Sequence, residues 1–546
     1  MIAYVNQYRY HILLGAILLV HALGMHNDIF NGDSALYASI SKNIATSGDW
    51  LILNSVMQDN WIDKPHLAFW IWAVALKFFG NTNLGFKLPS FLSLLLLLRY
   101  MFLWTAMFYK KETAWVAVLI LASSLHMMIS TNDVRIDLFL ICFMMGAIYH
   151  LQQYLSAHHF TQLMLGAVFA ALAVMTKGIY VVIPIGVSVI ASIIYHRSYR
   201  IILTWHWLAA ALVFLMGIAP ALYALKVQFA CYTDSHILGQ KPTNYLQFFF
   251  WDSQFGRFNS NLGQVASSGD PSYYLHTLLW SFAPWSILLV LVVFLKKNPW
   301  REPISISCAA VLLLILSISK TQLSHHILIV LPFFSIILAS VLVSKSHLKQ
   351  EKKYVFGLHY SILGIMVILA IFLAKWVIGE WSFQSIVYSL GLLILVLSVF
   401  RYPIGGKLVI ITSMMAIYLG LILNSVFYPE ILKFQFGRKT SDWVSKLDKC
   451  SSVEEFYVNI SLLNYYCSLP IKNTKVYAMD TLLEKRNNIL ITSEYGLSFL
   501  NLKKIKYKVL AEFLDFRTTV LTADFLNKNK RNGVCEKIYL VKINPN

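Results

Sequence analysis

The feature that most constrains this chain is a succession of apolar runs separated by short connections rich in lysine and arginine. A run of about twenty apolar residues is long enough for a helix to cross a bilayer. Of the 546 residues, 58% are hydrophobic and only 13% are charged. A soluble protein of this length could not cover so much apolar surface. The sequence therefore predicts an α-helical polytopic membrane protein.

We expect about thirteen membrane-spanning helices, several of them short at one end. No small-residue cleavage site follows the first run, which we interpret as an uncleaved membrane helix. The predicted spans are His11–Phe30, Leu88–Phe108, Thr113–Ser130, Leu138–Leu155, Thr161–Thr176, Ile179–Tyr195, Trp205–Leu225, Tyr273–Leu295, Ile304–Ser319, His326–Val343, Val355–Val377, Ser385–Phe400 and Leu408–Tyr428.

The net charge of +19 orients these spans. The basic residues lie in short loops, a pattern that favours a positive cytoplasmic side over nucleic-acid binding. If Leu67–Phe79 were another span, the most basic loops would all lie outside, and without it they all lie inside. We therefore expect a cytoplasmic N-terminus and an interfacial or re-entrant helix at Leu67–Phe79 in the first outer loop. The loops in question are Tyr109–Glu112, His196–Arg200, Leu295–Pro303 and Lys345–Lys353.

Two domains are predicted, a transmembrane domain over residues 1–429 and a small extracytoplasmic α/β domain over residues 430–546. Short strand-like runs in the tail indicate the second domain. They are Glu454–Ile460, Thr474–Asp480 and Lys537–Ile543. Three of the six cysteines, Cys450, Cys467 and Cys535, lie in this tail, where two of them could pair. The spacing of the cysteines does not indicate a metal site.

Charged side chains near the apolar helices gather on the predicted outer face. Carboxylates can hold a divalent metal, and lysine and arginine can hold a lipid phosphate. Both kinds of residue are costly at a membrane boundary unless they line a wet cavity. The acids are Asp33, Asp63, Asp133, Asp137 and Asp252, and the bases are Lys64, Lys177 and Arg257, with His325 in a late loop.

Each of these motifs also has a purely structural interpretation. Asp33 could be the N-cap of a surface helix over Ser34–Ala45. Arg135 could satisfy Asp133 and Asp137 in one salt-bridge cluster. The aromatic stretch around Asp252 and Arg257 could be an interfacial anchor, and Lys177 and His325 could be basic flanks of spans.

The order of the motifs resembles one family. An acid in "DSALYA", then "DKP" before an aromatic helix, an Asp after the third span, a "GRF" loop and "SISKTQLSHHILIVLP" are similar to the GT-C polytopic polyprenyl-phosphate-sugar glycosyltransferases. The lipid A aminoarabinose transferases are the nearest type, and the protein O-mannosyltransferases are more distant. The resemblance covers roughly residues 10–345.

The resemblance implies an inverting transfer of a sugar from an undecaprenyl-type phosphate carrier to an acceptor on the outer face of a bacterial inner membrane. It implies that Asp33 is the base and that Asp137 is a second catalytic acid. Lys64 and Arg257 then contact the carrier phosphate, and we add Lys177 and His325 to that set. The expected partners are the lipid-linked donor, a lipid or glycan acceptor such as lipid A, and membrane lipids, with no nucleic acid.

Five positions differ from the aminoarabinose transferase pattern. Asp63 and Asp252 stand where those enzymes have a metal-binding Glu and His, which favours Mg²⁺ or Mn²⁺ over zinc, or no metal. Leu36 replaces an arginine, His66 a second proline, and Gln322 a common basic residue.

Three alternatives stay open at this point. A protein O-glycosyltransferase of the same class would share the donor and differ in the acceptor. A lipid or solute transporter would also hold charges within a bundle. We see no internal repeat of the kind that many transporters carry. A receptor with the tail as its ligand-binding domain is the third.

Overall fold

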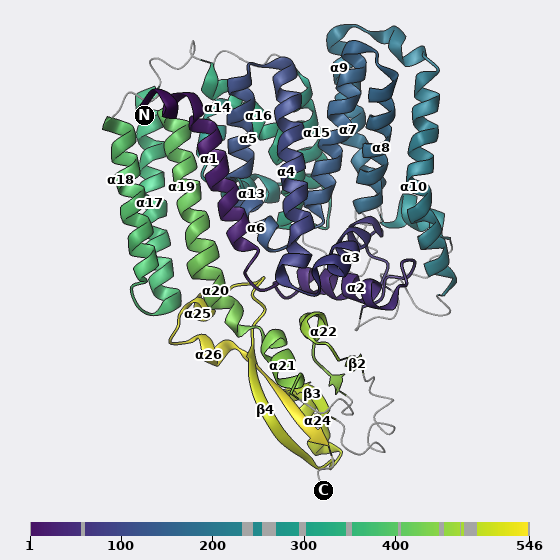
Figure 1. Cartoon of the computed structure of the whole chain (residues 1–546), viewed down its shortest axis with the longest axis vertical. Helices are drawn as coiled ribbons and strands as arrows, with labels where there is room; N and C mark the ends of the chain where they lie inside the picture. Colours follow the sequence, from purple (N-terminus) through teal and green to yellow (C-terminus); the bar gives the residue numbers. More distant parts are fainter. Residues whose placement is uncertain are drawn as a thin grey trace.

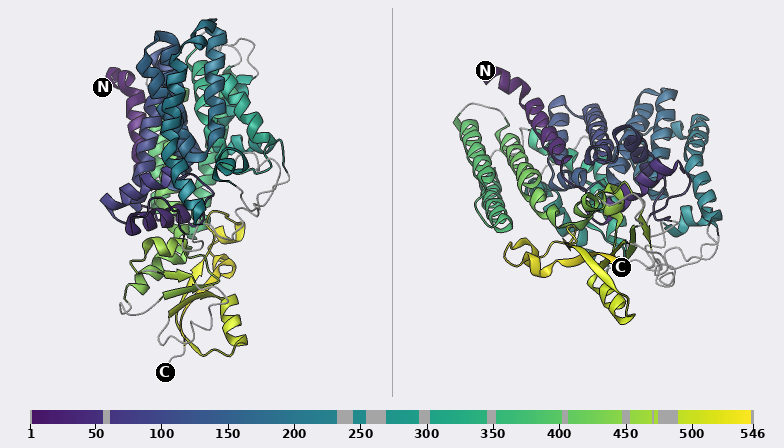
Figure 2. Two further views of the ribbon diagram at one scale, coloured as in Figure 1. Left: turned by 90° about the vertical axis from the view of Figure 1, so that its right-hand side faces the viewer. Right: turned by 60° about the horizontal axis from the view of Figure 1, so that its bottom comes forward.

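Long apolar helices run side by side in one bundle, and a smaller C-terminal region projects from one end of it (Figures 1 and 2). The structure is a computed structural model that describes residues 2–55, 61–231, 244–253, 269–293, 302–344, 352–401, 406–446, 453–469, 471–473 and 489–543. In these ranges 8 helices have the length and hydropathy of a membrane span, or up to 9 if a bent pair is counted as one. The chain is thus a polytopic helical membrane protein.

The bundle begins with α1 (Ile2–Gly24), which starts and ends earlier than the predicted run His11–Phe30. The helices that pass the length and hydropathy test are α4 (Asn83–Phe108), α7 (Asp137–Ala157), α8 (Phe160–Lys177), η1 with α9 (Ile179–Val181 and Val182–His196), α10 (His206–Ala230), α17 (Lys352–Ile378), α18 (Phe383–Arg401), and the continuous stretch of α19 (Lys407–Ile422), η5 (Leu423–Phe427), α20 (Tyr428–Ile431) and η6 (Leu432–Phe434).

Shorter helices complete the bundle. They are α5 (Lys111–Ala122), α6 (Leu125–Asn132), η2 (Tyr199–Leu203), α11 (Tyr245–Gln247), η3 (Phe248–Asp252), α13 (Tyr273–Ser281), α14 (Ser286–Val293), α15 (Ile304–Ile318), η4 (Ser324–Ile329) and α16 (Leu331–Val343).

The predicted span Thr113–Ser130 is two helices, α5 and α6, whose axes differ by 56°. Ser123 and Ser124 lie at the break. Each hydroxyl donates to a backbone carbonyl of α5, at 2.5 Å to Leu119 and 2.9 Å to Leu121. Such side-chain bonds compete with the regular helical ladder and accompany bends.

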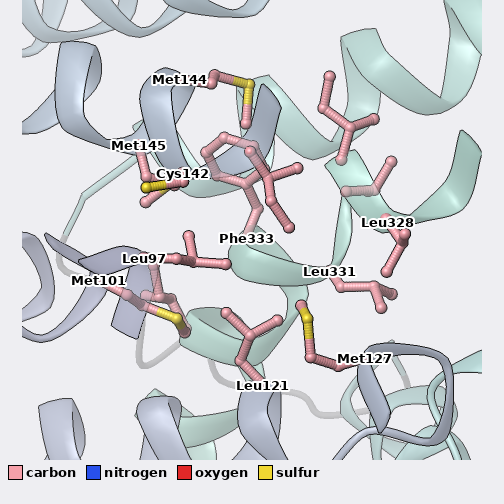
Figure 3. Packing of buried hydrophobic residues seen from close by; sticks show 14 of the residues in the cluster. Leu97, Met101, Leu121, Met127, Cys142, Met144, Met145, Leu328, Leu331 and Phe333 are labelled. Atoms are coloured by element: carbon pink, nitrogen blue, oxygen red, sulfur yellow. The ribbon is translucent and has the colours of Figure 1, made fainter. Parts of the chain in front are cut away.

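The centre of the bundle is a sulfur-rich apolar core between α4, α5, α7 and α16. Figure 3 shows methionine and leucine side chains packed near Phe333. Met101, Met144, Met145 and Phe333 are all fully buried. Methionine is unbranched and fills irregular gaps between helices, which fits a core in which several helices are broken or bent.

Two helices, α2 (Asp33–Ser47) and α3 (Leu67–Phe79), lie at the end of the bundle next to the C-terminal region (Figure 1). Their rings interlock, because Tyr37 stacks on Trp72 with centroids 5.9 Å apart and meets Phe69 edge-on at 5.6 Å. Trp72 and Phe69 are fully buried. This aromatic cluster fixes α2 and α3 relative to each other.

Lys87, near the start of α4, holds the chain that leads from α1 to α2. Its side chain is fully buried, and Nζ donates to the Asn27 carbonyl at 2.8 Å and to Asn132 Oδ1 at 2.7 Å. A buried ammonium requires such acceptors. Lys87 directly precedes the predicted span Leu88–Phe108, and its role in holding this chain segment was not predicted from the sequence.

The C-terminal region contains a five-stranded mixed sheet of order β2-β1-β3-β5-β4. Strand β1 is parallel to β2 and β3, whereas β5 is antiparallel to β3 and β4. The strands are β1 (Val453–Phe456), β2 (Ile471–Asn473), β3 (Ile489–Ser493), β4 (Tyr507–Asp515) and β5 (Glu536–Ile543). The helices are α21 (Phe436–Val444), α22 (Ser461–Tyr466), α24 (Glu494–Leu502), α25 (Ala523–Leu526) and α26 (Arg531–Val534).

Side chains alternate between the two faces of this sheet, as the pleat requires. Ile491 and Leu540 pack with α21 and α22, while Leu490 and Val541 pack with α24. Of the three predicted strands, two overlap β1 and β5, and the one over residues 474–480 lies outside the described residues. Cys467 and Cys535 are both free thiols, and Cys450 also lies outside the described residues.

Candidate functional site

The predicted acids of the first two outer loops meet around Arg135, at the junction of α6 and α7. Arg135 donates from Nη1 to Asp33 Oδ2 at 2.6 Å and from Nη2 to Asp133 Oδ2 at 2.6 Å. Ser34 Oγ donates to the other oxygen of Asp133 at 2.6 Å. This network joins the start of α2 to the α6–α7 junction, over residues about a hundred positions apart in sequence.

Asp33 is the first residue of α2, and its side chain does not cap the helix, contrary to one of our interpretations. The N-cap is Gly32, whose φ of 90° suits glycine. The Asp33 carboxylate turns to Arg135 instead and stays 48% exposed. Among the described residues, its Oδ2 accepts the hydrogen bond from Arg135, and no hydrogen bond to Oδ1 is present.

The cluster of Asp133, Arg135 and Asp137 is not self-contained, because Asp137 has a different partner. Lys177, the last residue of α8, donates to Asp137 Oδ1 at 2.5 Å, and the side chains are 3% and 4% exposed. Gly178 follows with φ 112° and ψ 180°, a conformation essentially restricted to glycine. The Lys177-Gly178 motif thus ends α8 with a buried cation beside the first residue of α7.

A pocket with an empty volume of about 350 Å³ lies between the first loop, α10 and η3. Asp63, Lys64 and Lys177 line it together, and Lys64 forms an ion pair with Asp63. Leu225, Phe248 and Phe249 belong to its apolar wall. Two cations against an apolar wall match a ligand with an anionic head and a hydrocarbon tail.

His66 also lines this pocket, but its buried ring has a structural role. The ring is 1% exposed, and Nε2 donates to the Leu51 carbonyl at 3.0 Å. Burial lowers the pKa of His66 to about 4, so the ring is neutral near pH 7. The residue that replaces a proline in this motif therefore adds no charge to the pocket.

Tyr37 lies near carboxylates of both the Arg135 network and the pocket, a position that was not predicted from the sequence. Burial raises its pKa well above the usual value, and the negative charges of Asp33, Asp63 and Asp137 raise it further. The signal was present in "DSALYA", since residues four apart lie on the same face of a helix, as do Asp33 and Tyr37.

His325 lies in η4, near the cations of the site. Its ring contacts that of His326, with centroids 4.7 Å apart. Burial lowers the pKa of His325 well below its usual value, and the positive charges of Arg135 and Lys177 lower it further. A neutral His325 therefore adds a hydrogen-bonding ring and no positive charge to this part of the molecule.

Gln322 holds the backbone that follows the aromatic loop. Its Nε2 donates to the Asp270 carbonyl at 2.8 Å, and its Oε1 accepts from the Asp270 amide at 3.1 Å. A lysine or arginine could not make both bonds, because neither has an acceptor. This contact gives a structural reason for the glutamine at this position.

The remaining predicted residues are Asp252 and Arg257. Asp252 is the last residue of η3, next to the pocket residue Ser253, and Arg257 lies outside the described residues. In the part of the chain that the structure describes, no three His, Cys, Asp or Glu side chains come together as a metal site would require. Asp63 forms an ion pair with Lys64.

The predicted resemblance to the polytopic polyprenyl-phosphate-sugar glycosyltransferases is confirmed. Residues 63–223, less than half of the chain, match the family described as dolichyl-phosphate-mannose-protein mannosyltransferase. The matched segment contains Lys64 and Lys177, which line the pocket, and Asp137, the partner of Lys177. The fold is shared with ArnT from Cupriavidus metallidurans, solved with undecaprenyl phosphate bound, with a TM-score of 0.75 over 97% of both chains at 15% identity.

Two relatives add sequence similarity to this likeness in fold. An undecaprenyl phosphate-alpha-4-amino-4-deoxy-L-arabinose arabinosyl transferase of Shewanella sediminis is 26% identical over 60% of this chain. A second transferase of that name, from Proteus mirabilis, is 23% identical over 65% of this chain. The matches span 58% and 64% of the lengths of these two relatives.

Proposed function

We propose that this chain is an inverting membrane glycosyltransferase that moves a sugar from an undecaprenyl-type phosphate to an acceptor on the outer face of a bacterial inner membrane. The observation that carries the proposal is the pocket in which Lys64 and Lys177 face an apolar wall, with Asp33 near enough that its charge, like that of the pocket residue Asp63, acts on Tyr37. The names of the similar transferases support an undecaprenyl phosphate-linked donor. The resemblance of the sequence motifs to lipid A aminoarabinose transferases favours a lipid A-type acceptor.

The carrier phosphate is the leaving group in this reaction. As the bond between the anomeric carbon and the phosphate oxygen breaks, the electron pair stays on the phosphate. Lys64 and Lys177 stabilise that charge, most strongly where water is excluded. Each lysine already has a carboxylate partner, Asp63 or Asp137, so the phosphate binds by sharing or replacing these partners. Arg257 is proposed as a further cation at this site.

Asp33 is proposed as the base. Arg135 fixes one carboxylate oxygen and leaves the other accessible. An acceptor hydroxyl would give its proton to Oδ1 while its oxygen attacks the anomeric carbon opposite the phosphate, which inverts that carbon. An acceptor phosphate is already anionic, and Asp33 would then orient it. Asp137 is assigned to hold Lys177 in place.

The same proposal places the chain in the membrane. We propose thirteen crossings, with α2 and α3 at the outer interface, the N-terminus in the cytoplasm and a periplasmic domain over residues 430–546. The boundary falls within α20, next to a cluster in which Phe30, Val377 and Phe525 pack with α20. Asp63 and Asp252 stay predicted ligands of Mg²⁺ or Mn²⁺, and no step above depends on a metal.

The test compares membrane glycolipids and glycoproteins, by mass spectrometry, from cells with the wild-type gene, without it, or with Lys64→Ala. Lys77→Ala is the matched control, since Lys77 is an exposed lysine of α3 that does not line the pocket. We expect one glycoconjugate to disappear in the deletion and in Lys64→Ala and to persist in Lys77→Ala, while the lipid-linked donor accumulates.

The identity of the lost product separates the acceptors. A missing sugar on lipid A supports the lipid acceptor, and a missing sugar on proteins supports the alternative of protein O-glycosylation. Unchanged glycoconjugates in the deletion strain would reject transferase activity altogether.

A further inference from the structure

A second pocket lies at the opposite end of the bundle from the candidate functional site. The helix α7 connects the two, because it begins at Asp137 and ends near Tyr154 and His158. The short helix η2 crosses this end between α9 and α10, away from the C-terminal sheet (Figure 1). The pocket has an empty volume of about 1160 Å³, open to solvent.

The polar lining of this pocket is basic. Arg197, Arg200, His158 and His206 line it, together with hydroxyl groups, and its lining contains no carboxylate. Both arginines are exposed, and among the described residues neither side chain forms an ion pair with a carboxylate. Two guanidinium groups without a carboxylate partner form a site for an anion with several oxygens.

The backbone presents two of these side chains in an unusual way. The helices α7 and α9 end in left-handed caps, which glycine usually occupies. Here the cap residues are His158, with φ 57°, and Arg197, with φ 52°. Both positions carry a basic side chain at a conformational cost that glycine would avoid.

The hydroxyl side of the pocket is ordered by hydrogen bonds. The Tyr154 hydroxyl lies 3.0 Å from His206 Nδ1 and 3.2 Å from Thr204 Oγ1. Tyr154 is 1% exposed, so it forms the floor. These contacts fix His206 and leave the two arginines at the rim.

Apolar side chains surround the basic pocket and point outward. Leu203 is 87% exposed, Trp205 68% and Leu208 67%. Exposed aromatic and aliphatic side chains next to basic groups are typical of a membrane interface. A soluble phosphate would not contact these apolar side chains, whereas the acyl chains of a lipid would cover them.

We propose that this pocket binds the headgroup of an anionic phospholipid in the leaflet opposite the candidate functional site, which our topology makes the cytoplasmic leaflet. The phosphodiester would accept hydrogen bonds from Arg197 and Arg200, and the acyl chains would lie along Leu203 and Leu208. Basic pockets between membrane helices recognise lipid headgroups in this way. The proposal concerns lipid binding alone and does not depend on the transfer reaction.

The test is native mass spectrometry of the delipidated full-length protein in detergent, titrated with phosphatidylglycerol or phosphatidylcholine. We expect wild-type protein to retain phosphatidylglycerol preferentially. Arg197→Gln with Arg200→Gln should weaken that binding about 25-fold, since each basic group near a charged lipid contributes roughly fivefold. Arg200→Gln alone, in the exposed helix η2, should weaken it about fivefold.

The matched control is Lys110→Gln with Lys111→Gln. It removes the same charge from two exposed residues at the start of α5, the N-cap Lys110 and the first helical residue Lys111, outside the pocket. Binding in this control should change less than about twofold. Equal losses in control and pocket variants, equal retention of the two lipids by wild-type protein, or unchanged binding in Arg200→Gln would each overturn the proposal. Displacement of the lipid by inorganic phosphate, with the same arginine dependence, would reassign the pocket to a soluble anion.

Discussion

Positively charged side chains are buried and paired at one end of the helix bundle and exposed at the other. At the candidate functional site, Arg135 and Lys177 bind carboxylates directly and have side chains only 14% and 3% exposed. At the other end, Arg197 and Arg200 are exposed, and the pocket that they line holds no carboxylate. A buried charge must be compensated by a partner, whereas water compensates an exposed one.

This difference has functional meaning. The paired cations of the candidate functional site are held in position before any ligand arrives, which is the preorganisation that catalysis requires. The arginines at the opposite end are free to follow a headgroup, which suits reversible binding. The comparison predicts that substitutions at the first end are costly and that substitutions at the second are mild.

The largest effect is expected for Asp33→Asn. If the acceptor is a hydroxyl, loss of the base should lower the rate of sugar transfer about 10²- to 10⁴-fold, measured with purified protein and lipid-linked donor. If the acceptor is a phosphate, the loss should be much smaller. The control is Asp442→Asn, at an exposed position of α21. Equal mild losses in both variants would remove Asp33 from the mechanism.

The next effect concerns the stability that buried pairing provides. Lys177→Met leaves Asp137 without its partner and should lower the free energy of unfolding by about 3–5 kcal/mol. Adding Asp137→Asn should recover part of that loss, because no uncompensated charge remains. Thermal unfolding of the three proteins in one detergent is the measurement. The pairing would be contradicted if the double variant lost more unfolding free energy than the two single variants lose in total.

The stability of the end that holds the candidate functional site should also depend on pH, because of His66. The pKa of His66 is about 4 in the folded chain because the ring is buried, against 6.5 in an unfolded one. The folded chain binds this proton more weakly, so the contribution of His66 to stability is complete above pH 6.5 and falls toward pH 4. By pH 4 roughly 3 kcal/mol should be lost. His66→Gln should flatten the pH profile of the unfolding temperature, and an unchanged profile would mean that His66 titrates freely.

The smallest effect is expected at the opposite end. Arg197→Gln with Arg200→Gln should change the free energy of unfolding by less than about 0.5 kcal/mol, because no buried carboxylate loses its partner. The transfer rate should also stay close to that of the wild type in a fixed lipid mixture. A large loss of stability in lipid-free detergent would show that these arginines have intramolecular roles, and the contrast between the two ends would fail.

The sequence predicted the elements of this molecule better than its contacts. Apolar length located most of the bundle, and it gave the bounds of the helix Leu67–Phe79 because "DKPH" and Gly80 delimit it. The bend between α5 and α6 was missed because the two helices belong to one continuous apolar run, in which the two serines at the break leave the average hydropathy high.

Ion-pair partners were harder to predict. Asp133 and Asp137 flank Arg135 in sequence, so a local cluster was a natural expectation. In the structure, Asp137 at the start of α7 pairs with Lys177, and Arg135 pairs with the distant Asp33. Tyr37 was missed for a related reason, since an aromatic residue on an amphipathic helix usually indicates packing. Only its position between three carboxylates distinguishes it.

The contact between α22 and α2 has a consequence for how such proteins can be recombined. Lys42, on the helix that begins with Asp33, donates to the carbonyls of Asn464 and Cys467 at 2.5 Å each, and Asn464 Nδ2 donates to Ser39 at 2.7 Å. These hydrogen bonds therefore attach the tail to α2, the helix that carries the candidate base Asp33. A chimera that exchanges residues 430–546 for the tail of another transferase should work only if α2 is exchanged with it.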